Sequence, residues 1–135
     1  MNQPKIITYI LDDQQHWLDL IKDMLSVDDY FEVAYFAKPD DFFENFSKDI
    51  DLVITDVRVP NYDVLATVET ISKINPSCYI IVMSAYFDVN IMKALMRLRV
   101  DDVVEKTSSI NWIQDLRVAI ERLKPRLIEK MRTKQ

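Results

Sequence analysis

The sequence predicts an α/β protein in which five parallel strands form one sheet that helices cover on both faces. Strand-like apolar runs alternate along the chain with segments whose apolar residues repeat at helical spacing. Such alternation is typical of parallel strands joined by crossover helices. Three of the runs, 6–11, 51–55 and 78–83, are almost continuously apolar, as strands buried on both faces are.

The elements follow one another in a regular order. Strands are predicted over 6–11, 31–36, 51–55, 78–83 and 102–105. Helical spacing of apolar residues is found over 17–25, 42–46, 64–74, 89–98 and 112–123. Pro39 suits the first turn of the second helix, and Asn75 with Pro76 ends the third. Either Ser108 or Ser109 is predicted to cap the last helix.

Length and composition limit the class of protein. The 135 residues suffice for one ordinary domain, and 49% hydrophobic with 29% charged residues describe a globular chain rather than a disordered one. No apolar run approaches the roughly 20 residues needed to cross a bilayer, and the N-terminus does not resemble a signal peptide. The single cysteine, Cys78, cannot form an internal disulfide. We therefore expect a cytoplasmic protein that does not bind membranes.

The charge and the glycine content lead to two further expectations. A net charge of −5 argues against direct nucleic-acid binding by this domain. Glycine is absent, so turns that need a positive φ are predicted to use Asn or Asp, which tolerate that region best among the other residues. The candidates are Asp28, Asp29, Asn61, Asn75, Asp88 and Asn90.

Polar side chains stand at the ends of four predicted strands. Asp12 and Asp13 follow the first strand, Asp56 the third, Ser84 the fourth and Lys106 the last. Parallel strands bring their carboxyl ends to one edge of a sheet, where α/β proteins bind ligands. Converging carboxylates repel unless a cation holds them, and Mg²⁺ prefers such oxygen ligands. An aspartate beside Mg²⁺ and a lysine can attack phosphorus, which predicts a phosphoryl-transfer site.

Each of these residues also has a structural explanation, because an aspartate after a strand is often a helix N-cap. Their combination resembles the response-regulator receiver domain, with an acidic pair, a phosphorylated Asp, a hydroxyl and a lysine in this order. Val59 and Pro60, which follow Asp56, and Ala85, which follows Ser84, agree with the same family pattern.

The resemblance extends to about Leu123. It implies a receiver domain over 1–123 and a basic tail or helix extension over 124–135. It also implies a flavodoxin-like (βα)5 sandwich with strand order 2-1-3-4-5.

The resemblance further assigns a role to each residue of the cluster. Asp56 would accept the phosphoryl group, and Lys106 would pair first with Asp56 and then with that group. Ser84 would donate a hydrogen bond to a phosphoryl oxygen. Asp13, Asp56 and the backbone carbonyl of Arg58 would bind Mg²⁺ directly, and Asp12 would act mostly through a bound water.

The implied activity is a signalling reaction rather than conventional enzyme turnover. A sensor histidine kinase or a histidine phosphotransfer protein would donate the phosphoryl group, and the domain would catalyse its own phosphorylation. The altered surface around the fourth helix, fifth strand and fifth helix would engage a downstream output protein or domain, and the same face would serve a homodimer. Autodephosphorylation at Asp56 is expected to be slow, because bulky Arg58 and Tyr86 flank the path of water.

The chain departs from the family pattern at two positions near the site. Val103 replaces the aromatic residue that usually couples phosphorylation to partner binding, and Thr107 replaces the Pro that commonly follows the lysine. Without that Pro a cis bond would cost about 3 kcal/mol or more, so a trans or strained loop is expected. Both departures lie where the family's conformational switch usually begins. In the last helix, Pro125 is predicted to cause a kink or a restart.

Two other functions fit part of the pattern. An unphosphorylated receiver-like interaction module that has lost the switch would explain Val103 and Thr107, although the intact acidic cluster and Lys106 argue against it. A haloacid-dehalogenase-like phosphatase also uses Asp and Mg²⁺. It needs a second Asp two residues after the nucleophile, where this chain has Arg58, and a larger chain.

Overall fold

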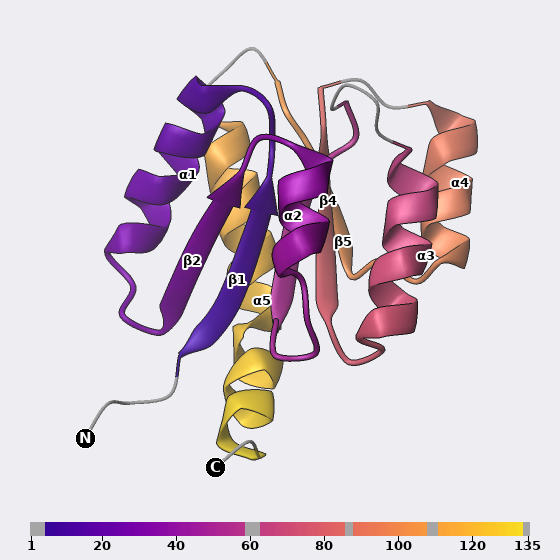
Figure 1. The fold of residues 1–135 in the computed structure, drawn as a ribbon. Helices are drawn as coiled ribbons and strands as arrows, with labels where there is room; N and C mark the ends of the chain where they lie inside the picture. The colour runs from indigo at the N-terminus through magenta and orange to yellow at the C-terminus, as the bar shows by residue number, and fades with distance from the viewer. Residues whose placement is uncertain (1–4, 59–62, 86–87, 108–110, 134–135) are drawn as a thin grey trace.

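The computed structural model describes residues 5–58, 63–85, 88–107 and 111–133, and its fold is the predicted α/β class. Five parallel strands form one sheet in the order β2-β1-β3-β4-β5 (Figure 1). The strands are β1 (Ile6–Leu11), β2 (Phe31–Phe36), β3 (Leu52–Asp56), β4 (Tyr79–Ser84) and β5 (Asp102–Glu105). The helices are α1 (Gln15–Ser26), α2 (Pro39–Asn45), α3 (Val64–Ile74), α4 (Val89–Arg97) and α5 (Trp112–Thr133). The strand order implied by the family resemblance is confirmed.

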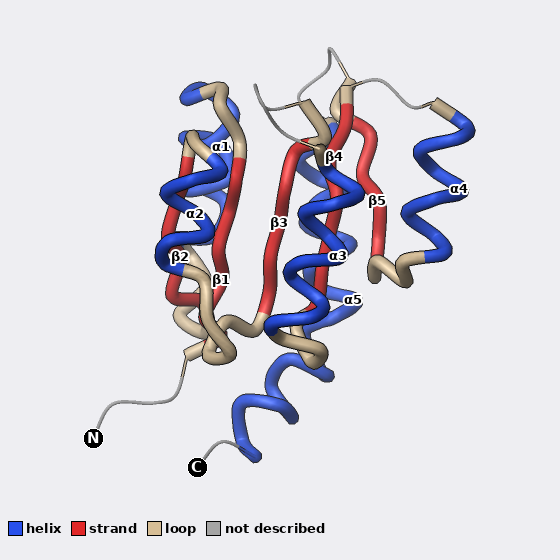
Figure 2. The backbone as a smooth tube through the Cα atoms, turned by 45° about the vertical axis from the view of Figure 1, so that its right-hand side comes forward, coloured by secondary structure: helices blue, strands red, loops and turns tan. Residues whose placement is uncertain are grey.

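The helices form two layers, one on each face of the sheet (Figures 1 and 2). Helices α1 and α5 cover one face, where Ile10, Ile54 and Trp112 belong to one apolar cluster. Helices α2, α3 and α4 cover the other, where Phe42, Val68 and Leu95 pack on alternate residues of the same strands. Every residue of β3 is buried, which explains why its first three residues, Leu52, Val53 and Ile54, are apolar. No helix in the described ranges is long and apolar enough to span a bilayer.

The ends of β3 and β4 lie one residue later than the sequence predicted. Asp56 pairs in register with Met83, and Ser84 pairs with Glu105. The ladder continues beyond both ends, because Val57 N–H donates to the Met83 carbonyl and Lys106 N–H to the Ser84 carbonyl. Asp56 and Ser84 are therefore the last residues of hydrogen-bonded strands, which limits the freedom of their backbones.

Aspartate caps begin two of the helices. The carboxylate of Asp63 accepts hydrogen bonds from the backbone N–H groups of Leu65 and Ala66 at the start of α3, and Asp88 accepts one from Asn90 at the start of α4. Helix α1 differs, because its N-cap is Gln14 and makes no side-chain hydrogen bond. The aspartates before α1 are therefore not conventional N-caps.

Helix α5 does not restart at Pro125 but continues as one helix to Thr133. Proline removes one intrahelical hydrogen bond, which costs about 3 kcal/mol in a helix interior. The apolar stripe continues past it, however, with Leu123, Leu127 and Met131 all buried on one face. Packing along this stripe accounts for the helix continuing where the sequence predicted an interruption, and α5 extends beyond the amino edge of the sheet (Figure 1).

The prediction that Asn or Asp would occupy the positive-φ positions is wrong for the described residues. Among them only Arg99 has a positive φ, of 62°. It follows Leu98, the C-cap of α4, at the position where helices commonly end in a left-handed residue. Glycine is usual there because it has no Cβ to crowd the carbonyl. Arg99 N–H donates to the Met96 carbonyl, which helps to hold this conformation.

Candidate functional site

Lys106 brings two of the predicted aspartates together at the carboxyl edge of the sheet. Its Nζ donates to Asp12 Oδ2 and to Asp56 Oδ2, the second at 2.5 Å. The three residues come from the ends of β1, β3 and β5, and they are 94 and 50 positions apart in the chain. All three are buried: the Lys106 side chain is 3% exposed and that of Asp56 is 8% exposed.

The other carboxylate oxygens of the cluster are held by backbone groups. Asp12 Oδ1 accepts from Gln14 N–H at 3.0 Å, and Asp56 Oδ1 accepts from Arg58 N–H at 2.8 Å. These bonds form within two residues of each aspartate, so the local turn fixes the orientation of each carboxylate. Asp56 thus has one oxygen on a backbone donor and the other on a side-chain donor.

Ser84 lies beside the lysine, as the sequence predicted from the strand ends. It is fully buried, and its carbonyl accepts from Lys106 N–H at 2.7 Å. This backbone bond keeps the Ser84 and Lys106 main chains adjacent. The carboxyl ends of four strands therefore meet at one edge, with two carboxylates, one ammonium and one hydroxyl-bearing residue.

The predicted metal ligands have the oxygen atoms that a metal ion needs, but their side chains do not converge on one point. Asp13 is exposed, whereas Asp12 and Asp56 are turned toward Lys106. In the described part of the chain, no group of three or more His, Cys, Asp or Glu side chains is arranged to hold a metal ion. Three carboxylates against one buried ammonium nevertheless leave excess negative charge, and their oxygens suit a hard dication. The ligand type, carboxylate oxygen, is therefore the one that Mg²⁺ prefers.

Burial raises the pKa of Asp12 above its ordinary value of 3.8. The hydrogen bond and the charge of Lys106 act in the opposite direction, and the negative charge of Asp56 adds to the increase. One ammonium between two carboxylates does not offset the cost of removing Asp12 from water. The ionised cluster is therefore held together at an electrostatic cost that another cation would reduce.

Two aromatic residues beside the lysine were not identified from the sequence. The Lys106 Nζ lies 5.7 Å from the centroid of the Trp17 ring and 5.7 Å from that of the Trp112 ring. The sequence predicts both only as apolar positions of helical segments. The sequence feature that points to them is their position, because each tryptophan lies in the first turn of the helix that follows a site residue.

Some sequence expectations concern residues outside the described ranges. These are the hydrophobic-Pro step at Val59 and Pro60, the flanking role of Tyr86, and the capping of the last helix by Ser108 or Ser109. Val103 is described and is partly buried against the cluster of α2, α3 and α4. The described residues contain no cis peptide bond, and Lys106 and Thr107 are among them.

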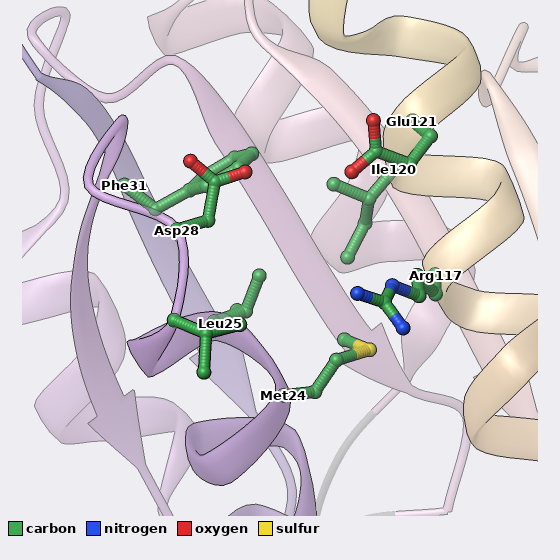
Figure 3. Close-up of a pocket in the computed structure, with 8 residues that line it drawn as sticks. Met24, Leu25, Asp28, Phe31, Arg117, Ile120 and Glu121 are labelled. Carbon is green, nitrogen blue, oxygen red and sulfur yellow. The ribbon is translucent and has the colours of Figure 1, made fainter.

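A small pocket lies away from this cluster, between the end of α1, the start of β2 and α5 (Figure 3). Its residues include Met24, Phe31 and Ile120, and Asp28 and Arg117 contribute charge. Its volume of about 30 Å³ accommodates about one water molecule. Ligand sites are about ten times larger, so this pocket does not compete with the carboxyl edge as a candidate site.

The chain matches a known protein family. Residues 8–119 match the response regulator receiver domain family. The match covers most of the chain and includes all the predicted site residues. The chain therefore belongs to the response regulator receiver domain family.

Solved structures of receivers have the same fold. A response regulator receiver domain protein from Clostridium thermocellum is 26% identical with a TM-score of 0.74, and the match covers 93% of this chain and 98% of that one. RcsB from Salmonella typhimurium is 26% identical with a TM-score of 0.78, over 96% of this chain and 68% of that one. DrrB from Thermotoga maritima, described as an OmpR/PhoB homolog, is 20% identical with a TM-score of 0.77, which shows the fold alone.

Some of these relatives are longer than this chain. The match to DrrB covers 90% of this chain but 54% of that structure. A cyclic di-GMP phosphodiesterase from Thermotoga maritima is 29% identical over 68 residues, which are 50% of this chain and 18% of that protein. This chain thus spans about half the length of the DrrB structure and about a fifth of the phosphodiesterase.

Proposed function

We propose that this domain accepts a phosphoryl group on Asp56 from a phosphohistidine, with Mg²⁺ bound, and that phosphorylation changes its binding to a partner. The donor is a sensor histidine kinase or a histidine phosphotransfer protein. The recipient of the signal is an output protein or domain. The pairing of buried Lys106 with both Asp12 and Asp56 is the observation that carries this proposal.

The cluster suits an in-line transfer to a carboxylate. One oxygen of Asp56 is held by Arg58 N–H, and the other faces a side chain that can follow the incoming group. An oxygen of Asp56 forms the new P–O bond as the P–N bond to the donor imidazole breaks, and the imidazole takes up a proton. Lys106 then moves onto the phosphoryl oxygens, and the Ser84 hydroxyl donates to one of them. Catalysis here is mostly positioning and charge compensation.

A divalent cation would supply positive charge that offsets the negative charge of the carboxylates and of the phosphoryl group. Asp13, Asp56 and the Arg58 carbonyl would hold it, with Asp12 acting through water. To hold it, Asp13 and Asp56 would need to face a common point. The excess negative charge of the cluster would favour its binding, because two carboxylates already share one ammonium.

Arg58 affects the rate at which phosphorylated Asp56 loses its phosphoryl group to water. Its backbone N–H holds Asp56, and its side chain is exposed next to the site. A bulky side chain there hinders water from reaching the phosphorus, so slow autodephosphorylation is part of the proposal.

The test is incubation with a small phosphodonor, acetyl phosphate, in the presence of Mg²⁺, followed by intact-mass measurement. We expect the mass of one added phosphoryl group in the wild type and in Asp63→Asn. That variant is a matched control, because Asp63 is an exposed aspartate whose capping role asparagine can fill. We expect no addition in Asp56→Asn, and none in the wild type when a chelator removes the metal. Addition that persists in Asp56→Asn, or a wild type that stays unmodified, would overturn the proposal.

A further inference from the structure

Both tryptophans of the chain lie beside the same ammonium group. The sequence contains two, Trp17 and Trp112, and each ring centroid is 5.7 Å from Lys106 Nζ. The two rings also contact each other edge to face, with centroids 5.1 Å apart and an interplanar angle of 80°. A lysine ammonium carries three N–H groups, and carboxylates accept two of them here.

The burial of this group makes the aromatic contacts significant. With 3% of its side chain exposed, Lys106 has little water to solvate its charge. Cation–π attraction is strongest in desolvated sites, and tryptophan is the best aromatic partner. Asp12 and Asp56 pull the ammonium toward the carboxyl edge, and the indole rings attract it from α1 and α5.

Trp112 has a feature that ordinary core packing does not explain. It is fully buried, and its indole Nε1–H has no hydrogen-bond partner among the described residues. A buried tryptophan usually finds a partner for this group, and phenylalanine would fill an apolar core without a polar atom. The use of indole at this position is understandable if its ring face, rather than its N–H, interacts with Lys106.

We propose that Trp17 and Trp112 clamp the Lys106 ammonium, and that this clamp positions it for phosphoryl transfer and couples its movement to α1 and α5. This proposal rests on the proposed function of Asp56. When Lys106 moves onto a phosphoryl group, its distance to both rings changes. Because each ring belongs to the first turn of its helix, the displacement reaches the α1–α5 layer directly. The clamp offers a route for the signal that does not use Val103.

The first experiment measures the rate constant of phosphorylation by acetyl phosphate below the unfolding temperature of every variant. Trp17→Leu removes one ring and should lower the rate constant about fivefold. Trp17→Phe keeps a ring and should stay within about twofold of the wild type. Trp112→Phe also keeps a ring and should stay within about twofold of the wild type, and because it removes the unpartnered N–H it should keep or raise the unfolding temperature. Tyr35→Leu is the matched control, since Tyr35 packs on the same core cluster from β2.

The second experiment uses tryptophan emission as the readout of coupling. Beryllofluoride with Mg²⁺ mimics the phosphoryl group, and its binding is followed independently by fluorine NMR. We expect the emission to change on binding in the wild type, in Trp17→Phe and in Trp112→Phe. Bound beryllofluoride without any change in emission would overturn the coupling.

A third measurement separates failure of the clamp from failure of the proposed function. The Lys106 Cε protons should show ring-current shifts in the unphosphorylated wild type, and these shifts should diminish in Trp17→Leu. If the wild type takes no phosphoryl group but shows these shifts, the clamp geometry stands and the proposed function fails. If Trp17→Leu loses the shifts yet reacts at the wild-type rate, the positioning role is wrong. If the wild type shows no shifts, the clamp itself is overturned.

Discussion

The two edges of the sheet use the same residue types in different ways. At the carboxyl edge, Asp12 and Asp56 share the ammonium of Lys106. At the amino edge, buried Asp51 accepts from Ile7 N–H at 2.9 Å and lies 3.5 Å from Lys130 Nζ. Each edge thus has a buried aspartate with a lysine, yet only one edge has the features of a reactive site.

The difference lies in the donors. The amino-edge carboxylates bind backbone groups of neighbouring strands, since Asp51 holds Ile7 and Asp101 holds Ile80 at 2.7 Å. Lys130 also donates to the Ser77 carbonyl at 2.8 Å, so its position is tied to the main chain. At the carboxyl edge, the donor that joins β1 and β3 is the Lys106 side chain, and in the proposed function it leaves Asp56 for the phosphoryl oxygens. An aspartate–lysine pair alone therefore does not indicate function. The distinguishing feature is whether a side chain or a backbone N–H group joins the strands.

The largest expected effect is a contrast between Asp51 and Asp56: one substitution should affect stability, and the other phosphorylation. Asp51→Ala should lower the free energy of unfolding by about 2–4 kcal/mol, because it leaves a buried backbone N–H without its acceptor and Lys130 without its counter-charge. Asp56→Ala should abolish phosphorylation but change stability by less than about 1 kcal/mol, since Lys106 keeps Asp12. Chemical denaturation and intact-mass measurement on both variants give the comparison. Equal losses of stability would show that the two edges do not differ in this way.

Replacing the more buried lysine, Lys106, should lower the free energy of unfolding more than replacing Lys130. Lys106→Met leaves two buried carboxylates without a cation and should cost about 3 kcal/mol at neutral pH. This loss should shrink as the pH falls, because burial raises the pKa of Asp12 and its protonation removes one of the unpaired charges. Lys130→Met should cost about 1 kcal/mol, since Lys130 is more exposed and Ile7 still holds Asp51. Denaturation curves at several pH values test both, and a larger loss for Lys130→Met would contradict the comparison.

Arg99→Gly tests the amino edge without touching an ion pair of the site. Arg99 has a φ of 62°, which glycine adopts without crowding, so the substitution should raise the free energy of unfolding by about 1 kcal/mol. Arg97→Gly is the matched control. It lies in the last turn of α4 and should lower stability by about 1 kcal/mol. Neither should alter the rate of phosphorylation, and a slower rate in Arg99→Gly would link the two edges.

The smallest effect is expected from the ion pair between Lys124 and Asp28, whose Nζ–Oδ2 distance is 2.5 Å. Partial burial raises the pKa of Asp28, but the hydrogen bonds from Lys124 and Tyr30 outweigh it, so the net pKa lies below 3.8. The hydrogen bond to Asp28 raises the pKa of Lys124 above 10.5.

The stabilisation from this pair is therefore fully present between about pH 4 and pH 10. It is lost as the pH falls through the lowered pKa of Asp28 or rises through the raised pKa of Lys124. Asp28→Asn should lower the free energy of unfolding in this range by less than about 1 kcal/mol. It should also reduce the fall in stability at the acid and the alkaline end of the pH profile. Asp29→Asn, at the adjacent residue, removes the same charge without breaking the pair with Lys124 and is the matched control. Thermal unfolding across the pH range tests this, and an unaltered profile in Asp28→Asn would exclude the pair as its source.

Much of the fold could be predicted because the chain is locally consistent. The strands over 6–11, 31–36 and 102–105 match the structure, and those ending at Asp56 and Ser84 differ by one residue at each end. Pro125 shows the limit of local inference. Its effect on a helix interior is unfavourable, but burial of Leu127 and Met131 depends on what the helix packs against, which the sequence pattern does not show.

The candidate site could be predicted only as a set of residues. The spacing of Asp12, Asp56, Ser84 and Lys106 at strand ends indicated one shared edge, and the structure joins Asp12, Asp56 and Lys106 directly. Asp13 carries the same chemistry in the sequence but is exposed in the structure. The choice between these adjacent aspartates depends on which side of the sheet edge each side chain faces, and a chain position alone does not specify that.

The sequence by itself determined the alternation of strands and helices and the residue types at the strand ends. Periodicity and polarity are local properties, and they suffice for these features. Only the tertiary structure decided that Lys106 would pair with two aspartates, that Trp17 and Trp112 would flank it, and that Asp51 would serve the opposite edge. Those contacts join residues far apart in the chain, so they depend on how parallel strands and their covering helices pack. The physical reason is that charge and ring geometry act through space, over distances that sequence separation does not measure.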